Sequence, residues 1–279
     1  MSDELRAPVP GAPSSSLEGP ERRCSKVARP RWLPLRGGRC NVFDVEPRRV
    51  LNMTEAFTAQ PSGLLEVRLS LAASEMLDAA GVAVSVATSG QLDNDALQTV
   101  CATDQGWAGE ARQFDLGEGP SYTAHRTGRP VQVADLEHDD TWPAFAKAAT
   151  TSGFRAVFAF PLRSGSVGIG ALTLYQRVAG ELTSEQQADA LAVAQFTCDL
   201  LSSLHRVHPA DELNPVFADG LARTEQASQA SGIVSVQLGI PVEAALSVLR
   251  AHAFAKELSL ADVATRVVEH RLDLSALPD

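Results

Sequence analysis

The feature that most constrains this fold is a change of pattern at HPADELNP, residues 208–215. Upstream of it, short β-branched runs typical of strands alternate with segments of helical spacing. Downstream, every periodic segment has helical spacing, so no further strand is expected. The two prolines of this stretch also interrupt the long helix that precedes it. We therefore predict an α+β domain over 62–206, a linker at 207–214 and an all-α module over 215–274.

The α+β part contains five short runs with the composition of strands. The last two runs flank a turn at 163–166 that contains Gly165, as in a β-hairpin. Because a hairpin joins neighbouring antiparallel strands, we expect an antiparallel sheet with helices around it. The expected strands are 81–88, 97–102, 129–133, 155–162 and 167–176.

Four helices are expected around this sheet, starting near residue 62, at 121–127 after the turn LGEGP, at 142–153 and at Thr183. The Thr183 helix carries two apolar stripes and therefore needs two packing partners. Contact with a second copy of the chain and packing within its own domain fit the pattern equally well. Trp107 is interpreted as part of a short polar loop. The two stripes are Leu191, Ala194, Cys198, Leu201 and Val193, Phe196, Leu200, Leu204.

Three helices are expected after the linker. The first runs from about Pro215 to Leu238, with Gly232 allowing close helix packing, and Gly239 ends it. The second begins at Pro241. The third has Ser259 as its N-cap, in a capping box. Three short helices with tight turns predict a small bundle.

Residues 1–52 hold seven prolines, ten basic and six acidic residues, and we expect them to be disordered. They are interpreted either as a basic arm for nucleic acid or acidic partners, or as sequence upstream of a true start at Met53, and the second interpretation is favoured. Residues 53–279 carry 14 basic and 28 acidic residues. An acidic body disfavours non-specific nucleic-acid binding, so any such role requires a local basic patch.

Several classes of protein do not fit the sequence. The sequence lacks an apolar window of membrane-spanning length and an apolar secretion signal, so a cytoplasmic protein without membrane contact is expected. The cysteines form no CxxC pair and are expected to be reduced. No paired acid–base or nucleophile set is visible, and neither a metal nor another cofactor is expected. The cysteines and the histidines considered as ligands are Cys24, Cys40, Cys101, Cys198, His125, His138, His205 and His208.

The C-terminal segments QASGIVSVQLG, EAALSVLRAHAF and LADVATRVVEHRL resemble the ANTAR domain of transcription antiterminators. The resemblance covers about residues 213–274. It implies a three-helix module that forms dimers and binds paired hairpins in nascent mRNA, which blocks formation of a terminator.

The α+β part resembles a GAF domain through FDLGEGPSYTAHRTGRPVQVADL (114–136), WPAF (142–145) and FRAVFAFPLRSGSVGIGALTLY (154–175). The resemblance implies an antiparallel sheet flanked by helices, with a small-molecule pocket or a dimer face. The ligand is not identified by the sequence. Candidate pocket residues are the aromatic residues Phe114, Tyr122, Trp142, Phe145, Phe158 and Tyr175.

The resemblance to ANTAR domains makes Arg250 the first candidate for RNA contact. The alternative is that Arg250 lies on a solvated helix face and pairs with Glu243 or Glu257. Residues 223–272 carry five basic and five acidic residues, so the expected positive patch is thin. The further candidates are His252, Arg271, Gln229 and Arg266.

These expectations combine into a dimeric regulator that senses a signal and binds RNA as a transcription antiterminator. The alternative is a dimeric GAF sensor that acts through protein contacts, with an ANTAR module that has lost RNA binding. An enzyme is not expected.

Overall fold

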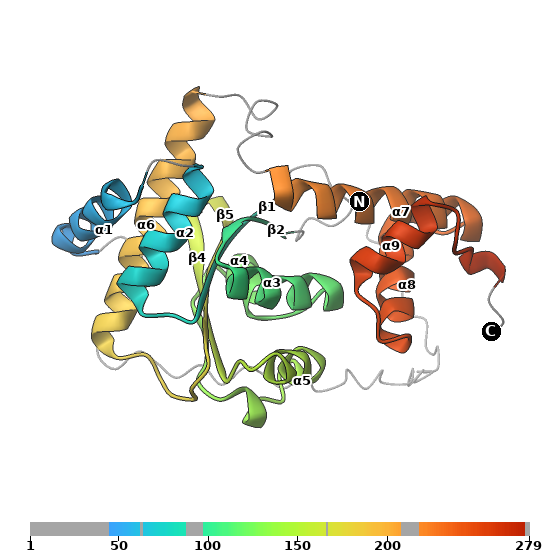
Figure 1. Ribbon diagram of the computed structural model, residues 1–279, viewed down its shortest axis with the longest axis horizontal. Coiled ribbons are helices and arrows are strands. Elements are labelled where there is room, and N and C mark those ends of the chain that lie inside the picture. The colour runs from blue at the N-terminus through green and yellow to red at the C-terminus, as the bar shows by residue number, and fades with distance from the viewer. Residues whose placement is uncertain (1–44, 62–63, 88–96, 166, 208–217, 277–279) are drawn as a thin grey trace, which may run out of the picture. The chain divides into compact units, whose positions relative to one another are not determined.

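The computed structural model describes residues 45–61, 64–87, 97–165, 167–207 and 218–276, all within one compact unit, Trp32–Asp279. Most of the expected disordered segment and the linker therefore lie outside the described residues. The elements, shown in Figure 1, are α1 (Pro47–Ala59), α2 (Leu65–Leu77), β1 (Gly81–Ala87), β2 (Leu97–Ala102), α3 (Asp104–Leu116), α4 (Pro120–Thr127), β3 (Val131–Val133), η1 (Leu136–His138), α5 (Pro143–Thr151), β4 (Ala156–Ser164), β5 (Val167–Gln176), α6 (Ser184–Val207), α7 (Ala218–Leu238), α8 (Val242–Ala255), α9 (Leu260–Val268) and η4 (Leu274–Ala276).

The five strands form one sheet in the order β2-β1-β5-β4-β3, and each neighbouring pair is antiparallel. The expected antiparallel sheet with flanking helices is confirmed. The β4–β5 turn contains Gly165 at φ +61°, a left-handed conformation that glycine adopts without steric cost. The strand expected at 129–133 begins two residues later, at Val131.

Both faces of the sheet are buried. Side chains alternate between faces along a strand, and β4 shows this directly. Phe158 and Phe160 pack in an apolar cluster with residues of α1, α2 and α6. Val157 and Ala159 pack in a second cluster with α5 residues such as Phe145. The helices therefore cover the sheet as two layers, α1, α2 and α6 on one side and α3, α4 and α5 on the other (Figure 1).

The expectation that residues 1–52 are disordered is wrong for residues 47–52, which form the first half of α1. Met53 in the middle of this helix is fully buried in the apolar cluster. Arg49 forms an ion pair with Asp189 of α6. A chain that began at Met53 would lose half of α1 and this ion pair. The sequence analysis missed this helix because its apolar period is short and the segment before it is rich in proline. Pro47 itself stands at the helix start, where proline is tolerated.

The two stripes of α6 find their partners within the chain. Val193, Ala194 and Cys198 are buried in the apolar cluster that also contains Phe158 and Phe160 of β4. Phe196 packs on Phe57 of α1 with ring centroids 5.4 Å apart. Helix α6 is therefore covered to a large extent by its own domain. Part of this cover comes from α1, which the sequence did not predict.

The expected C-terminal helices are present as α7, α8 and α9, and they share one apolar cluster. Ser259 caps α9 by accepting from the backbone of Asp262 at 3.0 Å, as expected. The expected start of the first helix at Pro215 lies outside the described residues. Gly232 does not serve close packing, because a Cβ there would meet no atom within 4 Å.

In the part of the chain that is described, no single helix is long and apolar enough to span a membrane. One bent pair of helices, Glu225–Leu238 and Val242–Ala255, meets the requirement for a span by length and composition only.

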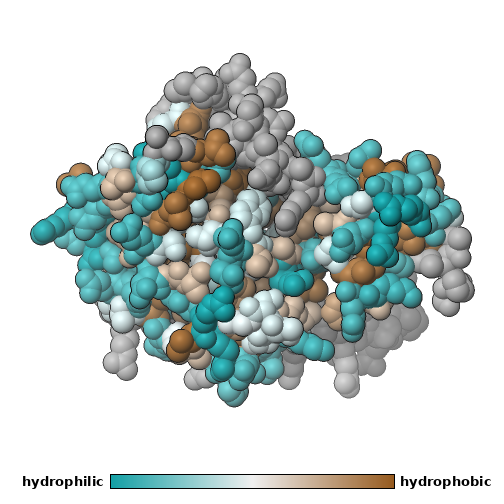
Figure 2. Space-filling model, viewed as in Figure 1, coloured by the Kyte–Doolittle hydropathy of each residue, from teal (hydrophilic) through white to brown (hydrophobic). Residues whose placement is uncertain are grey.

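Figure 2 shows apolar side chains gathered on this view where Figure 1 places α2 and α6. On α2, Leu71 is 44% exposed. Leu64 and Val67 precede it at helical spacing and are also exposed.

Candidate functional site

Helix α3, which the sequence analysis missed, positions the most polar part of the interior. Thr103 caps its start by accepting from the backbone of Gly106 at 3.2 Å. A Cβ at Gly106 would lie 2.0 Å from the carbonyl oxygen of Val82, and one at Gly109 would lie 2.3 Å from the ring of Tyr175. These two glycines let the helix backbone approach β1 and β5 closely. Trp107, expected in a loop, lies on this helix.

The face of α3 that meets the sheet carries Glu110 and Gln113, both buried. Together with Ser85, Ser121, Thr173 and Tyr175 they form what we call the Glu110 cluster. Glu110 Oε1 accepts from Tyr175 at 2.7 Å, from Ser121 at 2.8 Å and from Gln113 at 2.9 Å. Ser85 donates to Oε2 at 2.9 Å. Four donors thus converge on one carboxyl group from β1, α3, α4 and β5.

The electrostatics of the cluster are unusual. Burial raises the pKa of Glu110, and the hydrogen bonds from Tyr175, Ser121 and Ser85 oppose that rise. Burial and the neighbouring carboxyl group raise the pKa of Tyr175 well above its ordinary value. Among the described residues, the buried polar side chains include no Lys, Arg or His. The charged form of Glu110 therefore has donors around it and no buried counter-ion.

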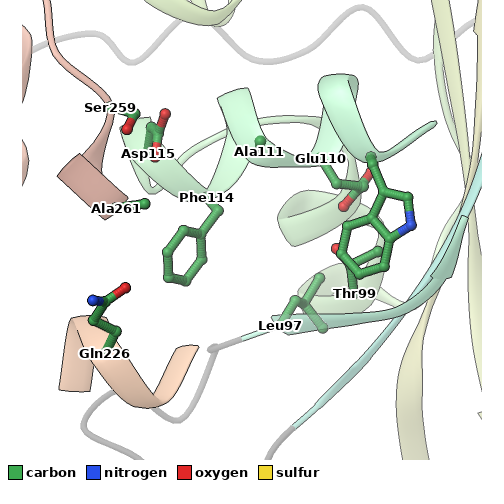
Figure 3. Close-up of a pocket in the computed structure, with 10 residues that line it drawn as sticks. Leu97, Thr99, Glu110, Ala111, Phe114, Asp115, Gln226, Ser259 and Ala261 are labelled. Carbon is green, nitrogen blue, oxygen red and sulfur yellow. The ribbon is translucent and has the colours of Figure 1, made fainter. Parts of the chain in front are cut away.

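A cavity of about 350 Å³ lies beside this cluster. Figure 3 shows Glu110 and Asp115 toward opposite ends of the pocket, with Phe114 between them. Strand β2 contributes Leu97 and Thr99, and the Thr99 hydroxyl pairs with that of Ser85 at 3.1 Å. The remaining lining residues are Trp107 and Ala111 of α3, Gln226 of α7, and Ser259 and Ala261 at the start of α9.

The six aromatic residues expected to line one pocket do not come together. Trp142, Phe145 and Tyr175 are buried in the cluster on the α5 side of the sheet. Phe158 is buried on the opposite face, because its neighbours in β4 take the α5 side. The remaining two are half-buried, and Phe114 is the one that lines the cavity. It also packs against the apolar cluster of α7 to α9.

The face of α3 that meets the sheet, which sequence reasoning missed, is made of glycines and polar side chains. Gly106, Gly109, Glu110 and Gln113 stand at i, i+3, i+4 and i+7, which is the spacing of one helix face. This spacing was the available signal. A search for apolar periodicity does not detect a buried face made of glycines and polar side chains.

The expected RNA-contact residues occupy different environments. His252 is half-buried, and its pKa is lowered by burial and then by the positive charges of Lys256 and Arg266. These three side chains therefore lie near one another, on α8, at its C-cap and on α9. Arg271 is exposed and pairs with Glu269. Gln229 is exposed on α7.

Arg250 has a different environment from the other candidates. Its Nε donates to the carbonyl oxygen of Phe114 at 3.3 Å, and its guanidinium lies 6.0 Å from the Phe114 ring centroid. Among the described residues, its hydrogen-bond partner is thus on α3 rather than Glu243 or Glu257. Asp115 reinforces this contact region by accepting from the backbone of Leu260 at 3.1 Å.

Burial raises the pKa of the Cys101 thiol, and it raises that of Cys198 to about 11. Both thiols are therefore poor nucleophiles at neutral pH. His138 pairs with Asp135 at 2.8 Å. No group of three or more potential metal ligands occurs within the described ranges. His208 lies outside them.

Comparison with known proteins identifies the α+β part. The family model described as GAF domain matches residues 63–203, which is 141 of the 279 residues. Helices α7 to α9 lie beyond this match. No curated protein matches the chain.

Solved structures that match part of the chain have low sequence identity to it. The GAF domain from a phosphoenolpyruvate-protein phosphotransferase of Coxiella burnetii is 15% identical, with a TM-score of 0.44, over 60% of this chain and 97% of that one. Free methionine-R-sulfoxide reductase from Neisseria meningitidis is 14% identical, with a TM-score of 0.42, over 58% of this chain and 91% of that one. By its family match, which spans the whole sheet, α2 to α5 and most of α6, the chain belongs to the GAF domain family.

Proposed function

We propose that this protein is a signal-responsive transcription antitermination regulator, with the GAF domain as sensor and α7 to α9 as a module that binds paired-hairpin RNA. Membership of the GAF family suggests small-molecule sensing. The RNA-binding part rests on the sequence resemblance of the last three helices to ANTAR domains. In this proposal the regulator acts in the cytoplasm as a homodimer and has no enzymatic activity.

The observation that carries the RNA-binding proposal is the group of positive side chains on α8 and α9. Lys256 and Arg266 lie close enough to His252 to lower the pKa of its imidazole. Both cationic residues are exposed. Basic groups gathered on one surface supply phosphate contacts, even where the net charge of the module is zero.

Arg250 links the two parts of the proposal. Its hydrogen bond to the Phe114 carbonyl occupies the side chain that the resemblance makes the best RNA contact. RNA binding through Arg250 requires this contact to be given up. Phe114 also lines the cavity beside the GAF sheet, so a ligand there can favour or oppose release of Arg250.

The test is a gel-shift titration of the full chain with a paired-hairpin RNA and a scrambled control, over several salt concentrations. Arg266→Ala should weaken binding to the hairpin and reduce the salt slope by about one for the lost phosphate contact. Arg112→Ala, an exposed arginine of α3, is the matched control and should leave binding unchanged. Equal, weak binding to both RNAs by the wild type would reject the RNA-binding proposal.

The second candidate function is a dimeric GAF sensor that acts through protein contacts. Two exposed apolar side chains of the helical module favour it, Val236 at 85% and Phe254 at 67% exposure. Leu64, which precedes α2, and Val67 and Leu71 on α2 are exposed and offer a further apolar face for a second copy. Light scattering of wild type and Leu71→Glu tests the dimer: a wild-type dimer that Leu71→Glu dissociates supports this face.

A further inference from the structure

The C-terminal end of α3 is contacted by a cation from the helical module. The last four carbonyl groups of an α-helix have no partner within it, and they carry partial negative charge. In α3 the carbonyl oxygen of Phe114 is one of these groups, and it accepts a hydrogen bond from Arg250 Nε of α8 at 3.3 Å. Arg250 therefore caps the end of a helix that belongs to the GAF part of the chain.

Gly117 makes this close approach possible. It follows α3 in the left-handed conformation, at φ +69°, and its N–H donates to the carbonyl oxygen of Gln113 at 2.8 Å. A Cβ at Gly117 would lie 2.6 Å from Arg250 Nη1 and 2.7 Å from its Cζ. The guanidinium thus lies against the turn that ends α3, in space that a side chain at position 117 would occupy.

The same end of α3 caps a helix of the module in return. Leu260 is the first residue of α9, so its N–H has no partner within that helix. This N–H donates to Asp115 Oδ1 at 3.1 Å. A carboxylate is favourable there, because a helix N-terminus carries partial positive charge. Figure 3 shows Asp115 beside Ser259, the N-cap of α9. Each part of the chain thus satisfies a helix end of the other part.

The packing around these two hydrogen bonds is incomplete. Phe114 packs against the apolar cluster of α7 to α9. Beside it lies the cavity of about 350 Å³, whose walls include Phe114, Asp115, Gln226 and Ala261. Protein interiors are otherwise close-packed, so a space of this size means that α3 does not fill the groove between α7 and α9. An interface with such unfilled space gives up fewer packing contacts when it opens.

We propose that these contacts form a latch that regulates RNA binding. The α3 latch consists of Phe114, Asp115 and Gly117 on one side and of Arg250 and Leu260 on the other. In the closed state α3 holds Arg250, and in the open state Arg250 joins the other basic residues of the module in contact with RNA. The two states compete for one guanidinium group, so RNA favours the open state. This inference rests on the proposed RNA-binding function and states how that binding is regulated.

The test is a gel-shift titration of the full chain with the paired-hairpin RNA and its scrambled control. Asp115→Ala removes the acceptor of the Leu260 N–H, and Gly117→Ala places a methyl group where the guanidinium lies. Both changes favour the open state, so both variants should bind the hairpin at least about fivefold more tightly than the wild type. If one of them does not fold by circular dichroism, the other still gives the result.

Each latch variant has a matched control. Asp104→Ala removes the same charge from the exposed start of α3, at the other end of the helix. Gly165→Ala places alanine at a similar φ of +61°, where a Cβ meets no atom within 4 Å. Both controls should bind RNA as the wild type does. Arg250→Ala lacks the side chain that the latch releases, so adding Asp115→Ala to it should give no further gain.

A measurement without RNA tests the closed state itself. Hydrogen exchange of the Leu260 amide, followed by NMR, should be faster in Asp115→Ala than in the wild type, because the acceptor of this amide is lost. Adding the hairpin RNA to the wild type should speed the exchange as well, because RNA binding opens the latch.

Several outcomes would overturn the latch. Equal hairpin binding by the wild type and both latch variants is one, and a gain from Asp115→Ala that persists in the Arg250→Ala background is another. Unchanged exchange of the Leu260 amide in Asp115→Ala would remove the closed state. If neither the wild type nor any variant prefers the hairpin to the scrambled RNA, RNA binding itself fails and the latch fails with it. Failure of the latch alone leaves that preference intact, so the two failures are distinguishable.

Discussion

The two faces of the sheet are both buried, yet they are built from different chemistry. The face covered by α1, α2 and α6 is packed with aliphatic and aromatic side chains such as Phe158 and Leu172. The face covered by α3 and α4 holds Glu110, Gln113, Ser121 and their partners in one hydrogen-bonded cluster. The first arrangement maximises the apolar area removed from water. The second places a carboxyl group in the interior beside a cavity, which favours a binding role over maximal stability.

The largest expected effect breaks the apolar face. Phe158 is fully buried, so Phe158→Ala removes a large apolar contact and leaves a cavity. We expect the free energy of unfolding to fall by about 3–5 kcal/mol. Urea unfolding followed by circular dichroism measures this, with Phe254→Ala at an exposed position as control. A loss equal to that of the control would contradict the assignment of Phe158 to the core.

The next effect tests how α3 approaches the polar face. A Cβ at Gly109 would overlap the Tyr175 ring, so Gly109→Ala must push the helix away from the sheet. Overpacking of this kind lowers the free energy of unfolding by about 1–3 kcal/mol. The displaced helix should also loosen the Glu110 cluster. Thermal unfolding measures this change. Another glycine such as Gly180 is not a suitable control position, because its φ of +157° is one that alanine rarely adopts. Ala108→Ser, at an exposed position of the same helix, serves instead.

The pH dependence of stability distinguishes the two faces further. The pKa of Glu110 is raised by burial from its ordinary value of 4.5, so the folded state holds this proton at pH values where the unfolded state has lost it. Its contribution to stability is therefore greatest below pH 4.5 and decreases as the pH rises toward the folded pKa. Within that window the slope approaches about 1.4 kcal/mol per pH unit. Denaturant titrations from pH 4 to 8 should show this slope for the wild type.

The control for this experiment is Glu110→Gln, which has no proton to lose at this site. Its free energy of unfolding should vary less with pH over the same window, while Glu243→Gln should follow the wild type. Identical pH profiles for wild type and Glu110→Gln would show that the buried carboxyl group titrates as an ordinary one.

The smallest effect lies in the helical module, away from both faces. Gly232 stands in the middle of α7, and a methyl group there meets no atom of the chain. Gly232→Ala should therefore raise the free energy of unfolding by about 0.5–1 kcal/mol, because alanine favours the helix more than glycine. Chemical denaturation measures the change. A gain in stability together with weaker RNA binding would show that the RNA approaches the backbone at this position.

The local residue pattern of the sequence was sufficient to predict much of the architecture. Alternation and the Gly165 turn predicted the antiparallel sheet, and the capping box at Ser259 predicted the start of α9. Helix α1 and helix α3 were missed for different reasons. The apolar period of α1 is short and begins at a proline. The buried face of α3 is made of glycines and polar side chains, for which hydrophobic periodicity has no signal.

The sequence by itself determined the approximate positions of the strands, the change to an all-helical end and the match to the GAF family, because these depend on local spacing along the chain. Tertiary structure decided which side chains meet. It separated Phe158 from Phe145 by one step of strand alternation. It brought Glu110 to Ser85, Ser121 and Tyr175 from four elements. It also placed Arg250 against Phe114 across 136 positions of sequence. Contacts of this kind depend on how α3 lies on the sheet, and no local pattern contains that information.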